Sequence, residues 1–422
     1  MAWSLGWPAG AVPPDYVLGG VRAVLPDAII DDARVVVRDG LIAEVSPAPA
    51  GSAADLDGAG LLCVPGLVDV HSDALERERA PRPGVLLPWD FAVVSLECKL
   101  SAAGITTVFH GAGFQDKLSG AVTRTVRTAI EVCDAVAART ADPAVLVGHR
   151  ILYRLDARSP DGASALAEAL GKAPGRAPAE ALGEVSGETL GEALDPCQAH
   201  AESLPLVSHE DHTPGQGQYA DRQYMERYVA SSHGLSAEEA ERHVDEMIEA
   251  RDAHLPALDR NMAWLGSLAL AGRIRLVGHD MDSPAAVEAL RARGGSVAEF
   301  PTTVDAARTA RDLGLPVVMG APNVMRGESH SGNVSAAELV GLGLVTALAS
   351  DYLPSGLLAG SFTLARSGLA TLPAAIGLVT SGAAASAGLS DRGRLAAGLR
   401  ADLALVDDAG SWPVVRATFR AS

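Results

Sequence analysis

The chain has 422 residues, of which 48% are hydrophobic, and its 34 basic and 52 acidic side chains give a formal net charge of −18. This length suits a (β/α)8 barrel plus a smaller domain, and the apolar content suffices for a folded core. The acidic balance and the lack of a basic run argue against nucleic acid as a partner. No uncharged apolar stretch is long enough to span a membrane, and residues 1–8 do not have the pattern of a signal peptide.

The cysteines point to a reducing compartment. They are widely scattered and form neither a CxxC pair nor a zinc framework, which is typical of reduced thiols in a cytoplasmic protein. We therefore expect a cytoplasmic location. The four cysteines are Cys63, Cys98, Cys133 and Cys197.

Both ends of the chain are rich in β-type runs. Residues 14–62 contain short runs punctuated by turns, among them a hairpin turn at Asp39 and Gly40. Residues 401–407 form a matching run near the C-terminus. We therefore expect one composite β-sandwich domain assembled from residues 1–62 and 386–422.

Between these ends, residues 63–385 alternate strand-like and helix-like segments, which predicts parallel βα units. The expected fold class is therefore α/β, with a metal-dependent (β/α)8 TIM-like barrel beside the composite β-sandwich. Ser236, followed closely by two glutamates, is typical of a helix start. Residues 160–200 are rich in Ala, Gly and Glu, and we expect a partly helical surface insertion there, without a catalytic role.

Five residues with metal-binding or acid–base side chains follow the ends of apolar β-type runs. Active sites of (β/α)8 barrels gather at the C-terminal ends of the strands, so we expect these side chains to meet at one mouth. Imidazole and carboxylate suit zinc, manganese or iron. The pattern predicts a metal-dependent hydrolase in which four of them bind metal and Asp351 is the general acid or base. The four expected ligands are His71, Asp73, His212 and His279.

The neighbours of these residues allow competing assignments. His209 and His212 face opposite sides of an extended strand, so we expect only one of them in the site, and the turn after His212 favours that residue. Asp280 and Asp282 follow His279 and are interpreted as helix caps or as groups that support the ligands.

Two segments are predicted to bind an anionic substrate. A glycine-flanked polar loop offers backbone N–H groups, hydroxyls and one cation to an anion, and it contains His330, Ser331 and Asn333. Arg82 stands between two prolines as a stiff, projecting arginine suited to phosphate. A small phosphorylated substrate is therefore the expected partner.

Residues 16–73 and 393–403 resemble the amidohydrolase superfamily, whose members carry a metallo-(β/α)8 barrel and a small composite β-sandwich. Within it, longer strings resemble the PhnM family of carbon–phosphorus lyase operons over nearly the whole chain, except near 160–200. These strings are His71-Ser72-Asp73 with Pro81-Arg82-Pro83, residues 102–109, 211–216, 299–303, 319–323 and 329–333, and Ser350-Asp351-Tyr352.

This resemblance implies hydrolysis of α-D-ribose 1-methylphosphonate 5-triphosphate to the 5-phosphate and pyrophosphate, by a metal-activated water that attacks phosphorus. It implies two divalent ions, zinc or else manganese or iron, with His71 and Asp73 on one and His212 and His279 on the other. It also implies a bridging carboxylate, which by position is Asp156, one methylene shorter than the family's glutamate.

Three positions depart from the family pattern: Ala74 replaces asparagine, His110 replaces aspartate and Gly217 replaces arginine. We expect His110 near the mouth, where it can change which anion fits, and His149 near the site. Two alternatives stay open. One is a divergent amidohydrolase that acts on another phosphorylated compound or a cyclic amide, and the other is a non-catalytic barrel used for binding or assembly. A homodimer is compatible with this architecture.

Overall fold

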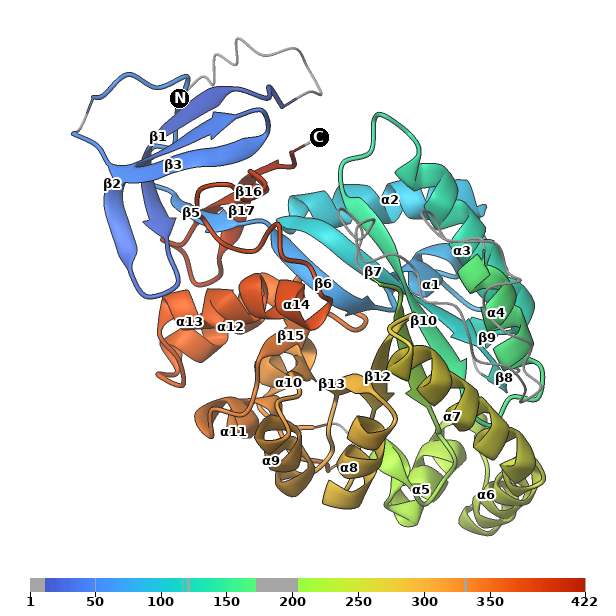
Figure 1. Cartoon of the computed structure of the whole chain (residues 1–422). Coiled ribbons are helices and arrows are strands. Elements are labelled where there is room, and N and C mark those ends of the chain that lie inside the picture. The colour runs from blue at the N-terminus through green and yellow to red at the C-terminus, as the bar shows by residue number, and fades with distance from the viewer. Residues whose placement is uncertain are drawn as a thin grey trace.

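The computed structural model describes residues 12–49, 51–115, 117–119, 122–171, 204–329 and 332–421. Its largest sheet is parallel and has eight strands (Figure 1). An isolated parallel bridge between Ser72 and Asp351 joins the last strand to the first and brings the sheet close to a closed barrel. The strands, in sheet order, are β15 (Ala347–Ala349), β14 (Val317–Gly320), β13 (Gly295–Glu299), β12 (Arg275–His279), β11 (Leu206–Glu210), β10 (Gly148–Asp156), β7 (Ile105–Phe114) and β6 (Leu67–Ser72).

Helices surround this barrel. Apolar residues of the strands and helices form one large cluster between the two layers, while a second cluster that includes Val68, Phe109 and Val277 fills the barrel interior. The helices are α1 (Ala74–Arg79), α2 (Trp89–Ala102), α3 (Val126–Thr140), α4 (Gly162–Gly171), α5 (Arg222–His233), α6 (Ala237–Asp252), α7 (Leu255–Leu270), α8 (Pro284–Ala292), α9 (Val304–Asp312), α10 (Ala321–Arg326), α11 (Ala336–Gly341), α12 (Gly356–Arg366), α13 (Leu372–Leu378) and α14 (Ser381–Ser386).

Two local features show how the sequence shapes this layer. Ser236 accepts a hydrogen bond from the Glu239 backbone, and Glu239 bonds back, so the predicted start of α6 is confirmed as a capping box. Helix α14 closes the amino-terminal end of the barrel, where Arg275, at the start of β12, donates to the Ser386 carbonyl (3.0 Å). The mouth at the opposite end is left for the site.

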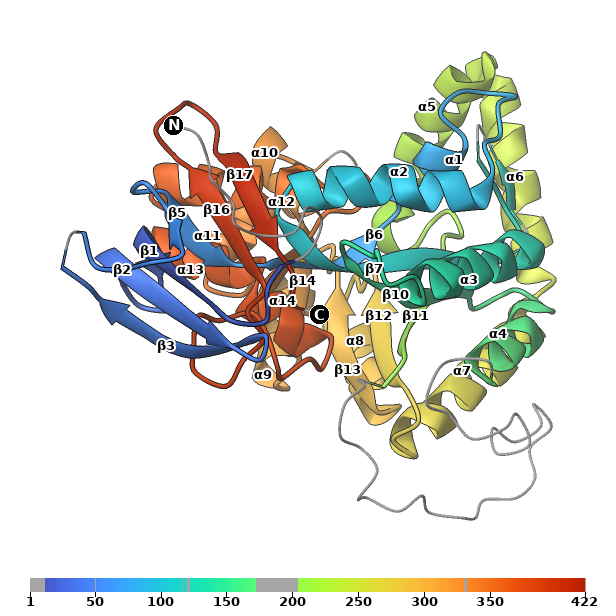
Figure 2. The ribbon, with the colours of Figure 1, turned by 90° about the horizontal axis from the view of Figure 1, so that it is seen from above.

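The two ends of the chain build a second, mixed sheet together, as expected (Figure 2). Its antiparallel pairing of β16 with β5 joins the C-terminal segment to the strand that leads directly into the barrel. A further two-stranded ribbon follows β7. The sheet comprises β17 (Val414–Phe419), β16 (Leu403–Asp407), β5 (Leu62–Pro65), β1 (Tyr16–Val24), β2 (Ile29–Arg38) and β3 (Leu41–Pro47), with β4 (Leu56–Asp57) on β1, and the ribbon is β8 (Lys117–Ser119) with β9 (Val122–Arg124).

The fold class predicted from the sequence, a barrel with a small β part from both chain ends, is confirmed. The exact domain boundaries stay a prediction. Of the expected insertion near 160–200, the described residues include helix α4, and residues 172–203 lie outside them. None of the described helices is long and apolar enough to cross a membrane.

Candidate metal centre

The carboxyl-terminal ends of the barrel strands bring histidines and carboxylates together at one mouth. Ligand-type atoms lie within 4.8 Å of one another in three groups, and shared histidines connect these groups. The rings of His71 and His279 stack with their centroids 5.7 Å apart. The groups are His71, Asp73 and Asp351; His212, His279 and Asp280; and His71, His279 and Glu299.

Closure of the barrel positions the first group. His71 lies near the end of β6, and Asp73 is the N-cap residue directly before α1. Asp351, directly after the last barrel strand, donates its backbone N–H to the His71 carbonyl (2.9 Å) and accepts from the Asp73 N–H (2.6 Å). The pairing of the last strand with the first therefore holds all three side chains together.

Left-handed backbone recurs just beyond the strand ends. Asp280, Phe300 and Asp351 have φ values of +56°, +51° and +54°, although none is glycine. Each such residue costs about 1–2 kcal/mol, and strain of this kind persists where the surrounding structure fixes a functional site. The turns aim these side chains at the mouth.

The second group contains buried polar atoms without hydrogen-bond partners. The Nε2 atoms of His212 and His279 lie 3.5 and 3.4 Å from Asp280 Oδ2. Within the described residues, His212 Nε2 and Asp280 Oδ2 are buried without a hydrogen-bond partner. A buried polar atom left unsatisfied costs about 1–3 kcal/mol, so these atoms fit a bound cation.

Two arginines surround the Asp73 carboxylate. Arg154 Nη1 on β10 lies 2.5 and 2.7 Å from its two oxygens, and Arg154 Nε also contacts Glu210 of β11. Arg124 bonds Asp73 (2.9 Å) and Glu76 (2.7 Å). Although burial opposes the effect, Arg154 and Arg124 hold the pKa of Asp73 well below its usual range. The Asp73 carboxylate is therefore ionised at neutral pH.

Asp351 has the opposite electrostatic environment. Burial, and then the negative charge of Asp73, raise the pKa of Asp351 above that of an ordinary aspartate. A carboxyl group with a raised pKa exchanges protons more readily near neutral pH, as a general acid or base must. The role of Asp351 as general acid or base stays a prediction, and the raised pKa is consistent with it.

Asp156 lies at the end of β10 but does not join the three groups. Its carboxylate pairs with Arg251 of helix α6 (2.5 and 2.9 Å) and accepts from the Arg158 backbone N–H (3.0 Å). Arg251 also bonds Asp211 (2.9 Å), so one guanidinium ties the helix to two strand ends. The bridging role of Asp156 stays a prediction, and these contacts count against it.

The other expected positions are scattered. Asn333 bonds the Gln218 carbonyl (3.4 Å), and Arg82 is exposed in the loop before α2. His330 and Ser331 lie outside the described residues. His209 belongs to none of the three groups formed by the described residues. The helix cap expected near Asp282 is Ser283.

His110 and His149 do not face the mouth. His110 Nε2 lies 2.8 Å from His149 Nδ1, and His149 Nε2 lies 3.2 Å from Glu97 of helix α2. Phe109 points into the barrel, so its neighbour His110 points outward to the helices, because side chains alternate along a strand. These contacts count against the expectation that both histidines lie near the site, and the influence of His110 on the anion that fits stays a prediction.

Four charged residues at the mouth received no role from the sequence. Arg154 and Glu210 are on strands β10 and β11 and share the parity of the inward-facing residues Leu152 and Leu206. The alternation of side chains along these two strands was therefore the feature of the sequence that could have placed Arg154 and Glu210 at the mouth. Glu299, at the end of β13, had the same signal as the expected ligands, while Arg124 is the last residue of the short strand β9 and offered none.

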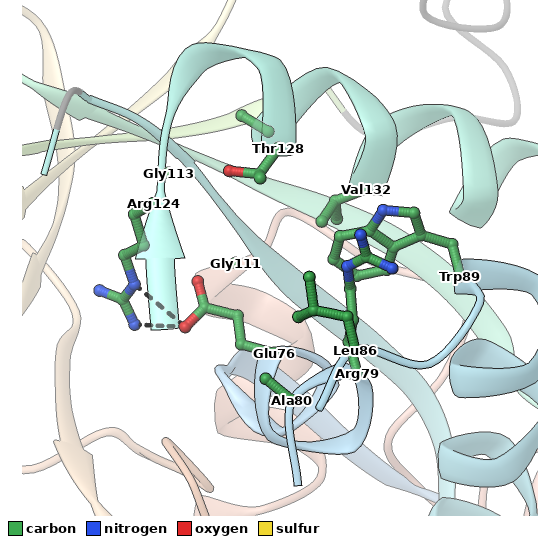
Figure 3. Close-up of a pocket in the computed structure, with 11 residues that line it drawn as sticks. Glu76, Arg79, Ala80, Leu86, Trp89, Gly111, Gly113, Arg124, Thr128 and Val132 are labelled. Atoms are coloured by element: carbon green, nitrogen blue, oxygen red, sulfur yellow. Dashed lines mark hydrogen bonds and ion pairs between the residues drawn. The ribbon is translucent and has the colours of Figure 1, made fainter. Parts of the chain in front are cut away.

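A pocket is lined by residues of α1, α2, α3 and β7 and by Arg124, which bonds Asp73 (Figure 3). At one end Arg124 pairs with Glu76, and at the other Arg79 stacks on the Trp89 ring, with the guanidinium 4.2 Å from the ring centroid. Gly111 lines the pocket, and a Cβ there would lie 2.6 Å from Asp73 Oδ1. The remaining lining residues are Ala80, Leu86, Gly113, Thr128, Ala129 and Val132.

Solved structures share this fold. An amidohydrolase matches with a TM-score of 0.50 and 16% identity, covering 96% of this chain and 99% of that one. An adenosine deaminase from Xanthomonas campestris, solved with bound zinc, matches with a TM-score of 0.50 and 14% identity over 96% and 91%. A prolidase in complex with N-methylphosphonate-L-proline gives 0.52 and 15% over 96% and 99%. The barrel with its composite sheet is thus the fold of the amidohydrolase superfamily.

A curated relative identifies the family. The chain is 33% identical over 353 residues, 83% of its own length and 84% of the relative's, to alpha-D-ribose 1-methylphosphonate 5-triphosphate diphosphatase from Escherichia coli (strain K12). No family model matches the chain. The chain belongs to the PhnM family within the amidohydrolase superfamily.

Proposed function

We propose that this chain is a metal-dependent diphosphatase that cleaves α-D-ribose 1-methylphosphonate 5-triphosphate to the 5-phosphate and pyrophosphate. The observation that carries the proposal is the meeting of His71, Asp73, His212, His279 and Asp351 at one barrel mouth, in a chain 33% identical to a diphosphatase of this name. The cationic and acidic side chains around the mouth supply the remaining chemistry.

Two metal half-sites follow from the three groups. The first half-site consists of His71, Asp73 and Asp351, and the second consists of His212, His279 and Asp280; they share no member. Mixed imidazole and carboxylate donors suit zinc, with manganese or iron as less favoured ions. When bound, such ions polarise a phosphoryl oxygen and lower the pKa of water.

The protein's own groups handle the proton and the substrate. Asp351 accepts the proton of the attacking water and delivers it to the leaving oxygen. Arg79 and Arg124 line the pocket and offer cationic groups to phosphate oxygens. Arg82 and the segment that contains His330, Ser331 and Asn333 complete substrate binding in this proposal.

Pyrophosphate release by the zinc-loaded protein, compared with the Asp351→Asn variant, tests the proposal. We expect zinc-dependent release that falls by about 10²–10⁴-fold in the variant, because the amide cannot accept the proton. Two zinc ions per chain in both proteins would show that the metal centre survives the substitution. Metal binding without any pyrophosphate release would leave a metallohydrolase with a different substrate.

A further inference from the structure

Glu299 lies behind the candidate metal centre and contacts a histidine from each half-site. Its side chain is buried at the end of β13, with 2% of the residue exposed. Oε1 lies 2.9 Å from His71 Nδ1, and Oε2 lies 2.8 Å from His279 Nδ1. The contact with His279 is a hydrogen bond, whereas the contact with His71 is at ion-pair distance only, and among the described residues His71 Nδ1 has no hydrogen-bond partner.

The opposite nitrogens of the same rings face the half-sites. His71 Nε2 lies 3.5 Å from Asp73, and His279 Nε2 lies 3.4 Å from Asp280. An imidazole that donates its Nδ1–H to a carboxylate keeps its Nε2 lone pair free for a metal, and its ring is held in one orientation. The hydrogen bond between Glu299 and His279 matches this arrangement, and the other Glu299 oxygen lies close enough to His71 Nδ1 for the same contact to form there.

The next residue supports the same two rings. Phe300 has a φ of +51°, and its ring centroid lies 5.2 Å from that of His71 and 5.4 Å from that of His279. His279 and Glu299 are register partners in adjacent parallel strands, so their side chains start side by side. The strained turn after Glu299 thus places a carboxylate and an aromatic ring against both histidines.

We propose that Glu299 is a positioning residue that holds His71 and His279 through their Nδ1 atoms and so couples metal binding at the two half-sites. This inference rests on the proposed function only in requiring that the site binds metal. It assigns no contact between Glu299 and the metal or the substrate.

Zinc affinity measured by chelator competition tests the coupling. In Glu299→Gln we expect both zinc ions to bind about 10–100-fold more weakly, the range found when a group supporting a metal ligand is removed. Asp280→Asn should weaken the binding of only one zinc ion, the one in the second half-site. The matched control is Glu97→Gln, which removes another buried carboxylate that holds a histidine away from the mouth, and which should leave both affinities unchanged.

The possible results distinguish a failure of the positioning role of Glu299 from a failure of the metal centre. Wild-type affinity for both ions in folded Glu299→Gln would overturn the positioning role while leaving the proposed function intact. Loss of only one ion in Glu299→Gln would also contradict the coupling. A wild-type protein that binds no zinc would overturn the metal centre itself, and the positioning role with it.

Nitrogen NMR of histidine-labelled, zinc-loaded wild-type protein gives a readout that does not depend on the variant folding. We expect His71 and His279 to carry their proton on Nδ1 and to show metal-induced shifts at Nε2. Metal-induced shifts at Nδ1 of either ring would mean that the metal lies on the Glu299 side and would overturn the proposal. A merely structural glutamate would not fix this tautomer in both rings.

Discussion

Arg154 Nη1 lies within 2.7 Å of both carboxylate oxygens of Asp73, so a buried cation from β10 stands against a candidate metal ligand of the first half-site. The same guanidinium contacts Glu210, so one arginine bonds two carboxylates at the mouth, of which Asp73 also pairs with Arg124. Two acids held by one fork-shaped cation keep a defined geometry that a point charge cannot reproduce.

Arg154→Leu should destabilise the protein strongly. Removing Arg154 leaves Glu210 without its arginine and Asp73 with Arg124 alone, and breaking a buried ion pair costs about 3–5 kcal/mol. Urea unfolding measures this loss of unfolding free energy. Arg154→Lys keeps the positive charge but lacks the planar guanidinium, so its unfolding free energy should lie between those of wild type and Arg154→Leu. Equal unfolding free energies of all three proteins would contradict the role assigned to Arg154.

Asp156→Asn should leave the zinc content unchanged. The Asp156 carboxylate is engaged by Arg251, so we expect lower stability, by about 1–3 kcal/mol, but two zinc ions per chain. Metal analysis of the purified variant checks this. The matched variant Asp73→Asn alters a candidate ligand and should lose zinc from the first half-site. Loss of one ion in Asp156→Asn would instead restore the bridging role inferred from the sequence.

Gly111→Ala should reduce zinc binding and activity by at least about tenfold. A Cβ at this position would lie 2.6 Å from Asp73 Oδ1 and 3.1 Å from Arg154 Cδ, so the Asp73 carboxylate must move. Displacing a reacting group by about 1 Å can cost on the order of a hundredfold in rate. Gly113→Ala is the control, because its Cβ meets the flexible end of Gln115 (2.8 Å), which can shift. Similar behaviour of both variants would count against this account.

Glu97→Gln should remove part of the acid sensitivity of folding. Although burial raises it, hydrogen bonds from His149, Arg139 and Leu146 lower the pKa of Glu97 to about 2 from an ordinary value of 4.5. A lowered pKa stabilises the fold above about pH 4.5, and this contribution is lost as the pH falls towards 2. We expect the variant to lose about 2–3 kcal/mol at pH 7. Unfolding curves between pH 2 and 7 that match wild type would contradict this.

Strand-end reasoning predicted the gathering of the candidate ligands because parallel strands of a barrel end at one mouth. It could not predict that Asp156 pairs with Arg251, since that contact depends on where helix α6 packs, and Arg251 lies 95 residues further along the chain. His110 points outward because side chains alternate along β7. Comparing this position with the aspartate of the family does not show on which face of the strand it lies. Glu299 was visible in the sequence, but its role depends on two histidines from other strands.

The most direct test of the proposed function is ³¹P NMR of α-D-ribose 1-methylphosphonate 5-triphosphate incubated with the zinc-loaded protein. The account predicts that the triphosphate signals are replaced by those of pyrophosphate and of a 5-phosphate monoester, with no orthophosphate at early times. Orthophosphate as the first product, or an unchanged triphosphate in the presence of bound zinc, would contradict it.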